Sequence, residues 1–297
     1  MFEKSHNPQI GVAEHLAEGL RVLTAPNASP MTYTGTRSYI LGEGEVAVID
    51  PGPESDAHFA ALMRALDGQR VSHIIVTHSH ADHSPLARRL AKAKDAPVLG
   101  FGPSSAGMSD FMRGLGALGG GEGVDKDFSP DIAVSDGEVI KGNGWALEAV
   151  HTPGHMSNHL CYAWEKALFS GDHVMGWSTT LVSPPDGDLT QFMDSMIKLQ
   201  NRGESTYYPG HGALLEDAHS MLAHQKAHRH GREAQILEAL GAATIPAITA
   251  KIYADLDPRL HPMAARNVFS HLIDLHKRGK VQTEGEISFN GRFELAG

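Results

Sequence analysis

The chain has 297 residues, 41% of them hydrophobic and 20% charged, an ordinary globular composition for one large domain with an appendage or for two domains. Its single cysteine, Cys161, excludes a disulfide framework and cysteine-rich zinc modules, and predicts a reducing, cytoplasmic location. The net charge of −10 disfavours nucleic acid as a partner, and no apolar run reaches the about 18 residues of a membrane span.

Short strands and helices alternate over most of the first 215 residues. A hairpin, a helix, a strand, a helix and a strand are predicted in turn over residues 35–53, 58–66, 71–77, 84–94 and 97–101. Ser84 is the expected N-cap of the second helix, because Pro85 follows it at a position where a missing N–H costs nothing. The glycine density over residues 102–128 predicts a mobile loop with little regular structure.

The rest of the chain falls into two parts that differ in kind. Strands are predicted over 145–151, 160–164, 167–170 and 206–208, and helices over 190–201 and 218–240. Beyond them, residues 248–256 and 262–278 predict helices, and residues 280–294 predict a hairpin. This order is typical of a winged helix, so we expect one domain over residues 1–225 and a second over residues 226–297.

Nineteen histidines are many for this length, and histidine is the commonest side-chain metal ligand at physiological pH. The densest cluster is the string T-H-S-H-A-D-H at residues 77–83, where a predicted strand ends. Alternate side chains face the same way along a strand, so His78 and His80 can share one metal while Asp82 and His83 lie towards a second. The alternative interpretation of this string is a histidine-rich exposed loop without a metal. That interpretation gives no reason to find further ligand-type residues elsewhere in the chain.

Three later segments each present one ligand-type side chain after a predicted strand: H-T-P-G-H (151–155), S-G-D-H (170–173) and Y-P-G-H-G (208–212). We therefore expect two metal ions, the first held by His78, His80 and His155, the second by Asp82, His83 and His211, with Asp172 bridging both. Three protein ligands and an open position mark a catalytic zinc site, and two such ions about 3.5–4 Å apart can share a hydroxide with a pKa near 7. The expected cofactor is thus two Zn²⁺ per chain, although such donor sets also accept iron or manganese. Metal-bound hydroxide is the expected nucleophile.

These motifs, in this order, resemble those of the metallo-β-lactamase superfamily. The resemblance implies an α/β fold with four layers, an αββα sandwich, and a dinuclear site between its two sheets. Residues 27–41, 171–211 and 260–281 also resemble the β-lactamase-like protein 2 family, which is typified by a single-strand endoribonuclease and carries the same winged-helix tail. The chain departs from that family at Arg37, where the family usually has asparagine, and over residues 179–187.

The same resemblance implies roles for residues around the metals. Asp50 is expected either to hydrogen-bond the second nitrogen of a ligand histidine or only to cap a turn. His159 is expected either to support the metal ligands from behind or to be an ordinary core histidine. Tyr33 and Arg37 belong to the loop that lines the family's substrate cleft, where they could bind a nucleotide or a carboxylate, or only pack. Asn158 could polarise a carbonyl or bind phosphate, or lie in an exposed loop.

Three functions remain open on the sequence. The first is hydrolysis of a small ester, thioester, lactone or β-lactam-type substrate, in which Asp82 orients the nucleophile and moves its proton. The second is single-strand endoribonuclease activity, and the third is a winged-helix nucleic-acid-binding regulator. From Gln225 onward ten Lys/Arg face eight Asp/Glu, about +2, which leaves about −12 for the remainder. This balance disfavours duplex DNA, so the second domain is expected to pack against the first or to form a homodimer.

Overall fold

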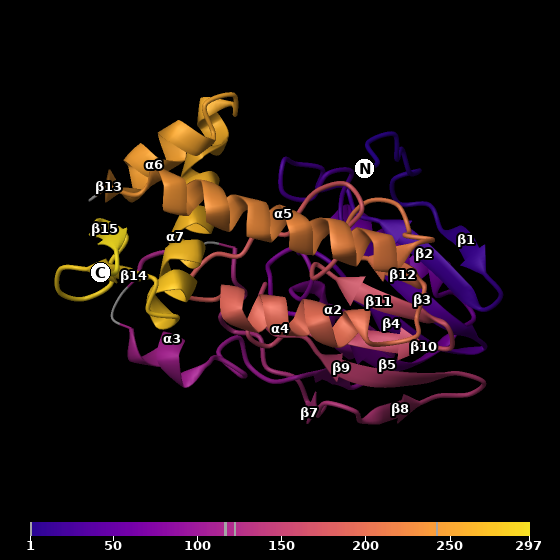
Figure 1. Cartoon of the computed structure of the whole chain (residues 1–297). Helices are drawn as coiled ribbons and strands as arrows, with labels where there is room; N and C mark the ends of the chain where they lie inside the picture. The colour runs from indigo at the N-terminus through magenta and orange to yellow at the C-terminus, as the bar shows by residue number, and fades with distance from the viewer. Residues whose placement is uncertain (1, 116–117, 122, 242) are drawn as a thin grey trace.

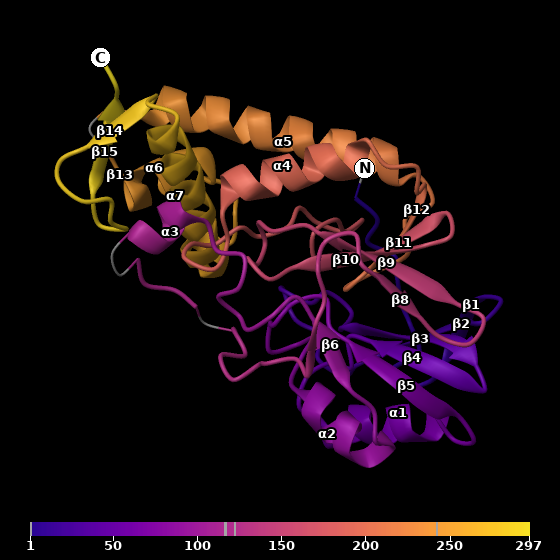
Figure 2. The same cartoon turned by 90° about the horizontal axis from the view of Figure 1, so that it is seen from below.

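The computed structural model describes residues 2–115, 118–121, 123–241 and 243–297. Two β-sheets lie face to face and helices cover the outer face of each, so the layers run helix, sheet, sheet, helix (Figure 2). The expected αββα sandwich is confirmed. Within the described residues, every helix is too short or too polar to cross a membrane.

The first sheet carries the N-terminal half of the sandwich. Its strands, in spatial order, are β1 (Glu14–Ala17), β2 (Leu20–Thr24), β3 (Arg37–Glu43), β4 (Glu45–Ile49), β5 (Arg70–Ile75), β6 (Val98–Gly100) and β7 (Ile132–Ala133). Pairing is antiparallel from β1 to β4 and parallel from β4 to β7. Helices α1 (Asp56–Ala65) and α2 (Leu86–Lys94) bury Leu62 and Leu90 against Val48 and Ile74 of this sheet. Strands β1 and β2 were not anticipated from the sequence.

The second sheet completes the sandwich. Its strands, in spatial order, are β12 (Thr206–Pro209), β11 (Ala167–Gly171), β10 (Leu160–Trp164), β9 (Ala146–His151) and β8 (Val139–Lys141). Helices α4 (Leu189–Gln200) and α5 (Ala218–Ala239) cover its outer face, where Phe192 and Leu222 pack with Leu168. Its inner face meets the first sheet in a core that includes Leu41 and Phe169.

The C-terminal part is the expected winged helix. It consists of β13 (Ala243–Thr244), α6 (Ile245–Ile252), the 3-10 helix η1 (Pro258–Leu260), α7 (His261–Lys277), β14 (Val281–Thr283) and β15 (Arg292–Leu295), with the strands in the order β13-β15-β14. Ile248, Phe269 and Phe293 lie in its own apolar core. Helix α5 runs unbroken through residues 225 and 226 and packs against α4 as well as α6 and α7 (Figure 1). The boundary at 225–226 therefore stays a prediction.

The glycine-rich stretch 102–128 is more ordered than the sequence suggests. It contains the short helix α3 (Asp110–Gly114), capped by Ser109, whose Oγ accepts a hydrogen bond from the backbone of Met112. Met112 and Leu118 pack into the winged-helix core, and Arg266 donates to the carbonyl of Leu118 at 3.0 Å. The expected free loop is thus, where described, a packed connection between the domains; residues 116, 117 and 122 lie outside the described part.

Ser84 does not cap α2 as expected. Its Oγ donates to Asp125 Oδ2 at 2.7 Å, and Pro85 occupies the N-cap position without a side-chain bond. Because Asp125 belongs to the glycine-rich stretch, the hydroxyl serves a long-range contact instead of the local one that the S-P pattern predicts.

The buried His58 on α1 predicts a pH dependence of stability. Its Nε2 lies 2.8 Å from Ser38 Oγ, and burial lowers the pKa of His58 from 6.5 to about 4. Between these two pKa values the unfolded chain binds a proton that the folded chain excludes, so stability falls as the pH decreases, by about 1.4 kcal/mol per pH unit. Denaturant unfolding at several pH values should show a slope that His58→Gln reduces by that amount; an equal slope in both proteins would contradict it.

Candidate metal centre

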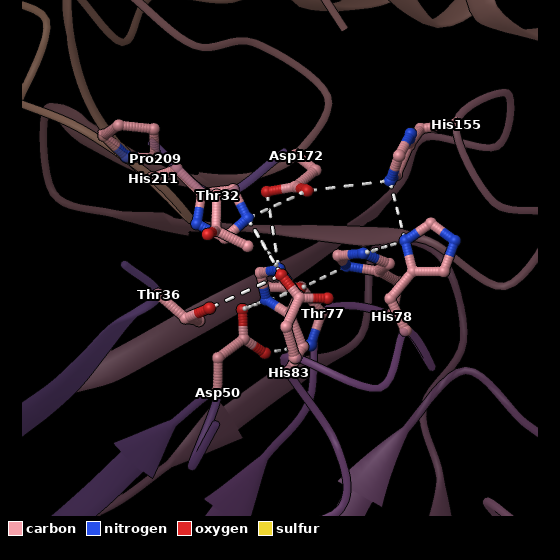
Figure 3. Close-up of polar contacts among 12 residues, drawn as sticks. Thr32, Thr36, Asp50, Thr77, His78, His83, His155, Asp172, Pro209 and His211 are labelled. Atoms are coloured by element: carbon pink, nitrogen blue, oxygen red, sulfur yellow. Dashed lines mark hydrogen bonds and ion pairs between the residues drawn. The ribbon is translucent and has the colours of Figure 1, made fainter. Parts of the chain in front are cut away.

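The motifs singled out in the sequence converge at one edge of the two sheets. The loop after β5 supplies His78, His80, Asp82 and His83, the β9–β10 connection supplies His155, and the segments after β11 and β12 supply Asp172 and His211. Figure 3 shows Asp172 between His155 on one side and His211 on the other. Two groups of donor atoms result, each within 4.8 Å: His78, His80, His155 and Asp172, and Asp82, His83, Asp172 and His211.

The first group contains three imidazoles whose nitrogens meet at one point. His80 Nδ1 lies 3.0 Å from His78 Nε2 and 2.9 Å from His155 Nε2. Burial lowers the pKa of His78 well below its ordinary value and that of His80 to about 3. These imidazoles are therefore neutral at pH 7, the form that binds a cation.

The second group combines imidazoles with carboxylates. His211 Nε2 lies 3.1 Å from Asp82 Oδ2 and 3.3 Å from Asp172 Oδ2. Burial opposes a charge on His211, but the carboxylate of Asp172 raises the pKa of this imidazole to about 9. Burial likewise disfavours the carboxylate of Asp172, yet the facing imidazoles hold its pKa well below the usual range. The carboxylates of Asp82 and Asp172 are thus ionised, which is the form that binds a cation, and a bound cation would take the place of the protons on His83 and His211.

Hydrogen bonds behind the ligands set their orientation. Asp50 accepts from His83 Nδ1 at 2.9 Å and from the Thr77 hydroxyl at 2.7 Å (Figure 3). His155 Nδ1 donates to the carbonyl of Leu181 at 2.7 Å. Such contacts turn the other ring nitrogen towards the centre. Together with the converging nitrogens of the first group, they make this donor set fit two divalent cations. Thr77 was missed as a supporting residue although it opens the T-H-S-H-A-D-H string.

The remaining residues considered in the sequence lie around the cluster in different ways. His159 is buried beneath it, with its ring centroid 5.1 Å from that of His78 and its Nδ1 2.8 Å from Thr152 Oγ1. Asn158 is buried, not exposed, and its amide donates to Ser79 Oγ at 3.0 Å. This contact ties the loop after β5 to the β9–β10 connection. The side chain of Asn158 therefore has a structural role, and we assign it no contact with substrate.

Tyr33 and Arg37, the two residues expected at the substrate cleft, make different contacts in the structure. Tyr33 stacks on Trp177, with ring centroids 5.0 Å apart and an interplanar angle of 13°. Arg37 is 2% exposed, its guanidinium lies 2.8 Å from His6 Nε2, and it is absent from the walls of the cavities described below. The N-terminal segment covers Arg37, so we assign it no role in substrate binding.

Two further buried residues bear on the chemistry. Cys161 lies inside β10, and burial raises the pKa of its thiol to about 12, so it is no competing nucleophile. His173 directly follows Asp172, yet its ring packs on Phe192 at a centroid distance of 4.5 Å, on the side of α4. His173 belongs to neither group of donor atoms.

The metal centre opens into a cavity of about 1180 Å³. Its walls come from both domains, and the winged helix contributes Met263, Arg266 and Phe289. The sequence offered no sign of this contribution, because the cavity depends on how the two domains dock.

Gly210 provides a test of how tightly this centre is built. A Cβ at this position would lie 2.4 Å from Asp172 Oδ1 and 2.7 Å from His83 Cε1. Gly210→Ala should therefore displace two ligands and lower metal affinity about 10- to 100-fold, as loss of ligand support does elsewhere. Elemental analysis after dialysis measures the bound metal. The matched control is Gly203→Ala, where no heavy atom lies within 4 Å. Equal metal content in both variants would contradict the geometry.

Comparison with known families decides the identity of the fold. A family model described as the metallo-beta-lactamase superfamily matches residues 32–211. The chain belongs to the metallo-beta-lactamase superfamily. A second model, described as the beta-lactamase associated winged helix domain, matches residues 244–291. The superfamily thus accounts for the sandwich and the metal centre, and the second model for the C-terminal domain.

Individual relatives agree with this assignment. An atrochrysone carboxyl ACP thioesterase of Aspergillus aculeatus is 30% identical over 244 residues, which cover 80% of this chain and 70% of that protein. A beta-lactamase-like protein 2 homologue of Drosophila melanogaster is 30% identical over 282 residues, 86% and 87% of the two chains. The solved structure of a beta-lactamase domain protein from Burkholderia ambifaria has a similar fold, with a TM-score of 0.80, 22% identity and coverage of 98% and 96%. The chain is a hydrolase of this fold, and the fold implies that its His/Asp cluster binds divalent metal.

Proposed function

We propose that this superfamily member is a dinuclear metal-dependent hydrolase of acyl thioesters, one of the small ester-type substrates that the sequence allows. The observation that carries the proposal is the cavity beside the metal centre. Apart from the ligands its described walls are largely apolar, as with Met31, Leu181 and Phe289, and they contain one arginine and no lysine. Such walls suit an acyl group, and a relative is named as a thioesterase.

Two bound Zn²⁺ ions, or iron or manganese in their place, would polarise the scissile carbonyl and lower the pKa of a water molecule. The chain supplies the rest. Asp172 and the ligand imidazoles are buried and would hold the metal ions in place. Asp82 is the one carboxylate of the two donor groups that is partly exposed, with 25% of its side chain accessible. We infer that the carboxylate of Asp82 orients the attacking water, accepts its proton and returns it to the leaving sulfur.

Single-strand endoribonuclease activity is the second candidate, favoured by the similarity to the beta-lactamase-like protein 2 homologue over nearly the whole chain. Its difficulty is electrostatic. Among Lys and Arg side chains, the described cavity walls carry Arg266 alone, so the phosphodiester backbone of an RNA meets little compensating charge beyond the metal centre. The regulator hypothesis is weaker still, because α7 of the winged helix faces the cavity with Met263 and Ala265.

The two candidates are separated by parallel assays of the metal-loaded protein. Thioesters of coenzyme A with acyl chains from acetyl to dodecanoyl, followed by release of free thiol, should be hydrolysed with a kcat/KM that rises with chain length. A fluorescent single-stranded RNA should stay intact. The Asp82→Asn variant should lose thioester hydrolysis, while the exposed Asp67→Ala control keeps it. RNA cleavage that depends on Asp82, with thioesters untouched, would overturn the proposal.

The same residues bear on the partners of the protein and on its cellular compartment. A small-molecule substrate in preference to RNA or duplex DNA fits a largely apolar cavity whose described walls contain one arginine and no lysine, and a single buried cysteine, Cys161, fits the cytoplasm. We also propose a homodimer as a possible assembly, beside the packing of the winged helix on its own chain, where α7 contacts α4 and α5.

A further inference from the structure

A second, smaller cavity of about 380 Å³ also borders the metal centre. Both cavities are lined by His155 and Asp172, and both touch Met31, Leu181 and Met263. The metal centre therefore lies where two compartments meet. A hydrolase divides its substrate into two fragments, and two compartments give each fragment its own place.

The walls of the smaller cavity are more polar than those of the larger one. They include Ser178, Thr179 and Asn267, together with Lys4 of the N-terminal segment. The backbone N–H of Glu3 donates to the carbonyl of Gly176 at 2.9 Å and so holds Lys4 beside this loop. Lys4 is exposed and forms no ion pair with the residues that the structure describes. Its ammonium group is thus available to an anionic group at the mouth of the cavity.

The polar wall is tied to the metal centre through a buried arginine. Arg229 of α5 donates to Asn267 Oδ1 at 2.7 Å and also to the carbonyl of Thr180. The hydroxyl of Thr180 in turn donates to the backbone carbonyl of Asp172 at 2.7 Å. Tyr33 stacks on Trp177, which lines the same cavity. The wall is therefore held by contacts from both domains.

We propose that the smaller cavity binds the thiol arm of the substrate, an amide-containing chain that ends in an anionic phosphate near Lys4, while the acyl group occupies the larger cavity. This assignment rests on the proposed thioester hydrolysis. Water attacks the carbonyl carbon, a carbon–oxygen bond forms and the carbon–sulfur bond breaks. One proton of the water goes to the sulfur, and the acid and the thiol then leave through different compartments.

Two neighbouring alanines on α7 provide a matched test. Ala264 lines only the smaller cavity and Ala265 only the larger one, and both are 7% exposed. Ala264→Leu should raise KM about fivefold or more for acyl-coenzyme A, because the larger side chain fills space that the thiol arm needs. The KM for the ethanethiol thioester of the same acid, which has no such arm, should change by less than about twofold. Ala265→Leu should do the reverse: it should lower kcat/KM for dodecanoyl thioesters about tenfold, whichever thiol is attached, and spare acetyl thioesters.

The exposed Lys4 gives a second test that does not disturb packing. Lys4→Gln should raise KM about threefold for acyl-coenzyme A and leave that for the phosphate-free N-acetylcysteamine thioester unchanged, whereas the exposed control Lys166→Gln changes neither. If Ala264→Leu and Lys4→Gln affect all thiols alike, or none, the assignment is wrong. Binding of a non-hydrolysable thioether analogue of acyl-coenzyme A, measured by calorimetry, separates the two claims. If the analogue binds in a Lys4-dependent way but no thioester is cleaved, only the proposed function is refuted. If thioesters are cleaved but neither the Lys4 nor the Ala264 variant changes KM, only the cavity assignment is refuted.

Discussion

Asp172→Ala should abolish thioester hydrolysis, with a loss of about 10³-fold or more, and should reduce bound metal from two ions to fewer than one per chain. Asp172 is the one residue common to both groups of donor atoms, and its carboxylate lies 3.3 Å from His211, 3.5 Å from His83 and 3.6 Å from His155. Its removal leaves buried imidazoles without their shared counter-charge, so neither ion keeps a full ligand set. Elemental analysis and steady-state kinetics on the same preparation measure both effects.

His173→Asn is the matched control beside it. His173 adjoins Asp172 in sequence but contacts Phe192 instead of the metal centre, so the variant should retain two ions per chain even if packing against α4 weakens. Equal loss of metal in both variants would contradict the assignment of Asp172 as the shared ligand.

Asp50→Ala should have the second-largest effect, on stability and on metal affinity together. Asp50 accepts hydrogen bonds from the backbone N–H of Thr77, the Thr77 hydroxyl and His83 Nδ1, all within 2.9 Å and all buried. Removal of one partner from such a buried network costs about 3–5 kcal/mol, and loss of support behind a metal ligand lowers affinity about 10- to 100-fold. Chemical unfolding of the metal-free protein and metal titration measure the two parts separately.

Asp50→Asn refines this prediction. Asp50 has a φ of 50°, a conformation that asparagine tolerates better than most residues, so the variant avoids added backbone strain. The amide keeps one acceptor but not the charge, and we expect it to retain more stability than the alanine variant while still binding metal weakly. Unaltered metal affinity in the Asp50→Asn variant would show that the charge behind His83 is unimportant.

The metal centre was predictable because its donors are local signals that recur at strand ends. T-H-S-H-A-D-H places four ligand-type residues within one loop, and the three later motifs each follow a strand, so strand order alone brings them to one sheet edge. Asp50 directly follows β4, which pairs with β5, but its place behind His83 was implied by the family resemblance and not by the strand pattern. The structure brings these seven residues together in two groups of donor atoms, and their role as metal ligands stays a prediction.

What the sequence could not indicate depends on contacts between distant segments. Arg37 looked suited to an anionic substrate, but His6 of the N-terminal segment covers it. The stretch 102–128 looked free because glycine disfavours regular structure, yet Arg266 of the winged helix binds its carbonyls. The wall that α7 adds to both cavities has no local signature either, because domain docking depends on surfaces and not on motifs.

Titration of the metal-free protein with Zn²⁺, while hydrolysis of dodecanoyl-coenzyme A is followed, tests whether catalysis requires both metal sites. We expect no turnover in the presence of a chelator and a rate that reaches its maximum at two ions per chain, because both groups of donor atoms must be filled. Full turnover in the metal-free state, or a maximum reached at one ion per chain, would contradict it.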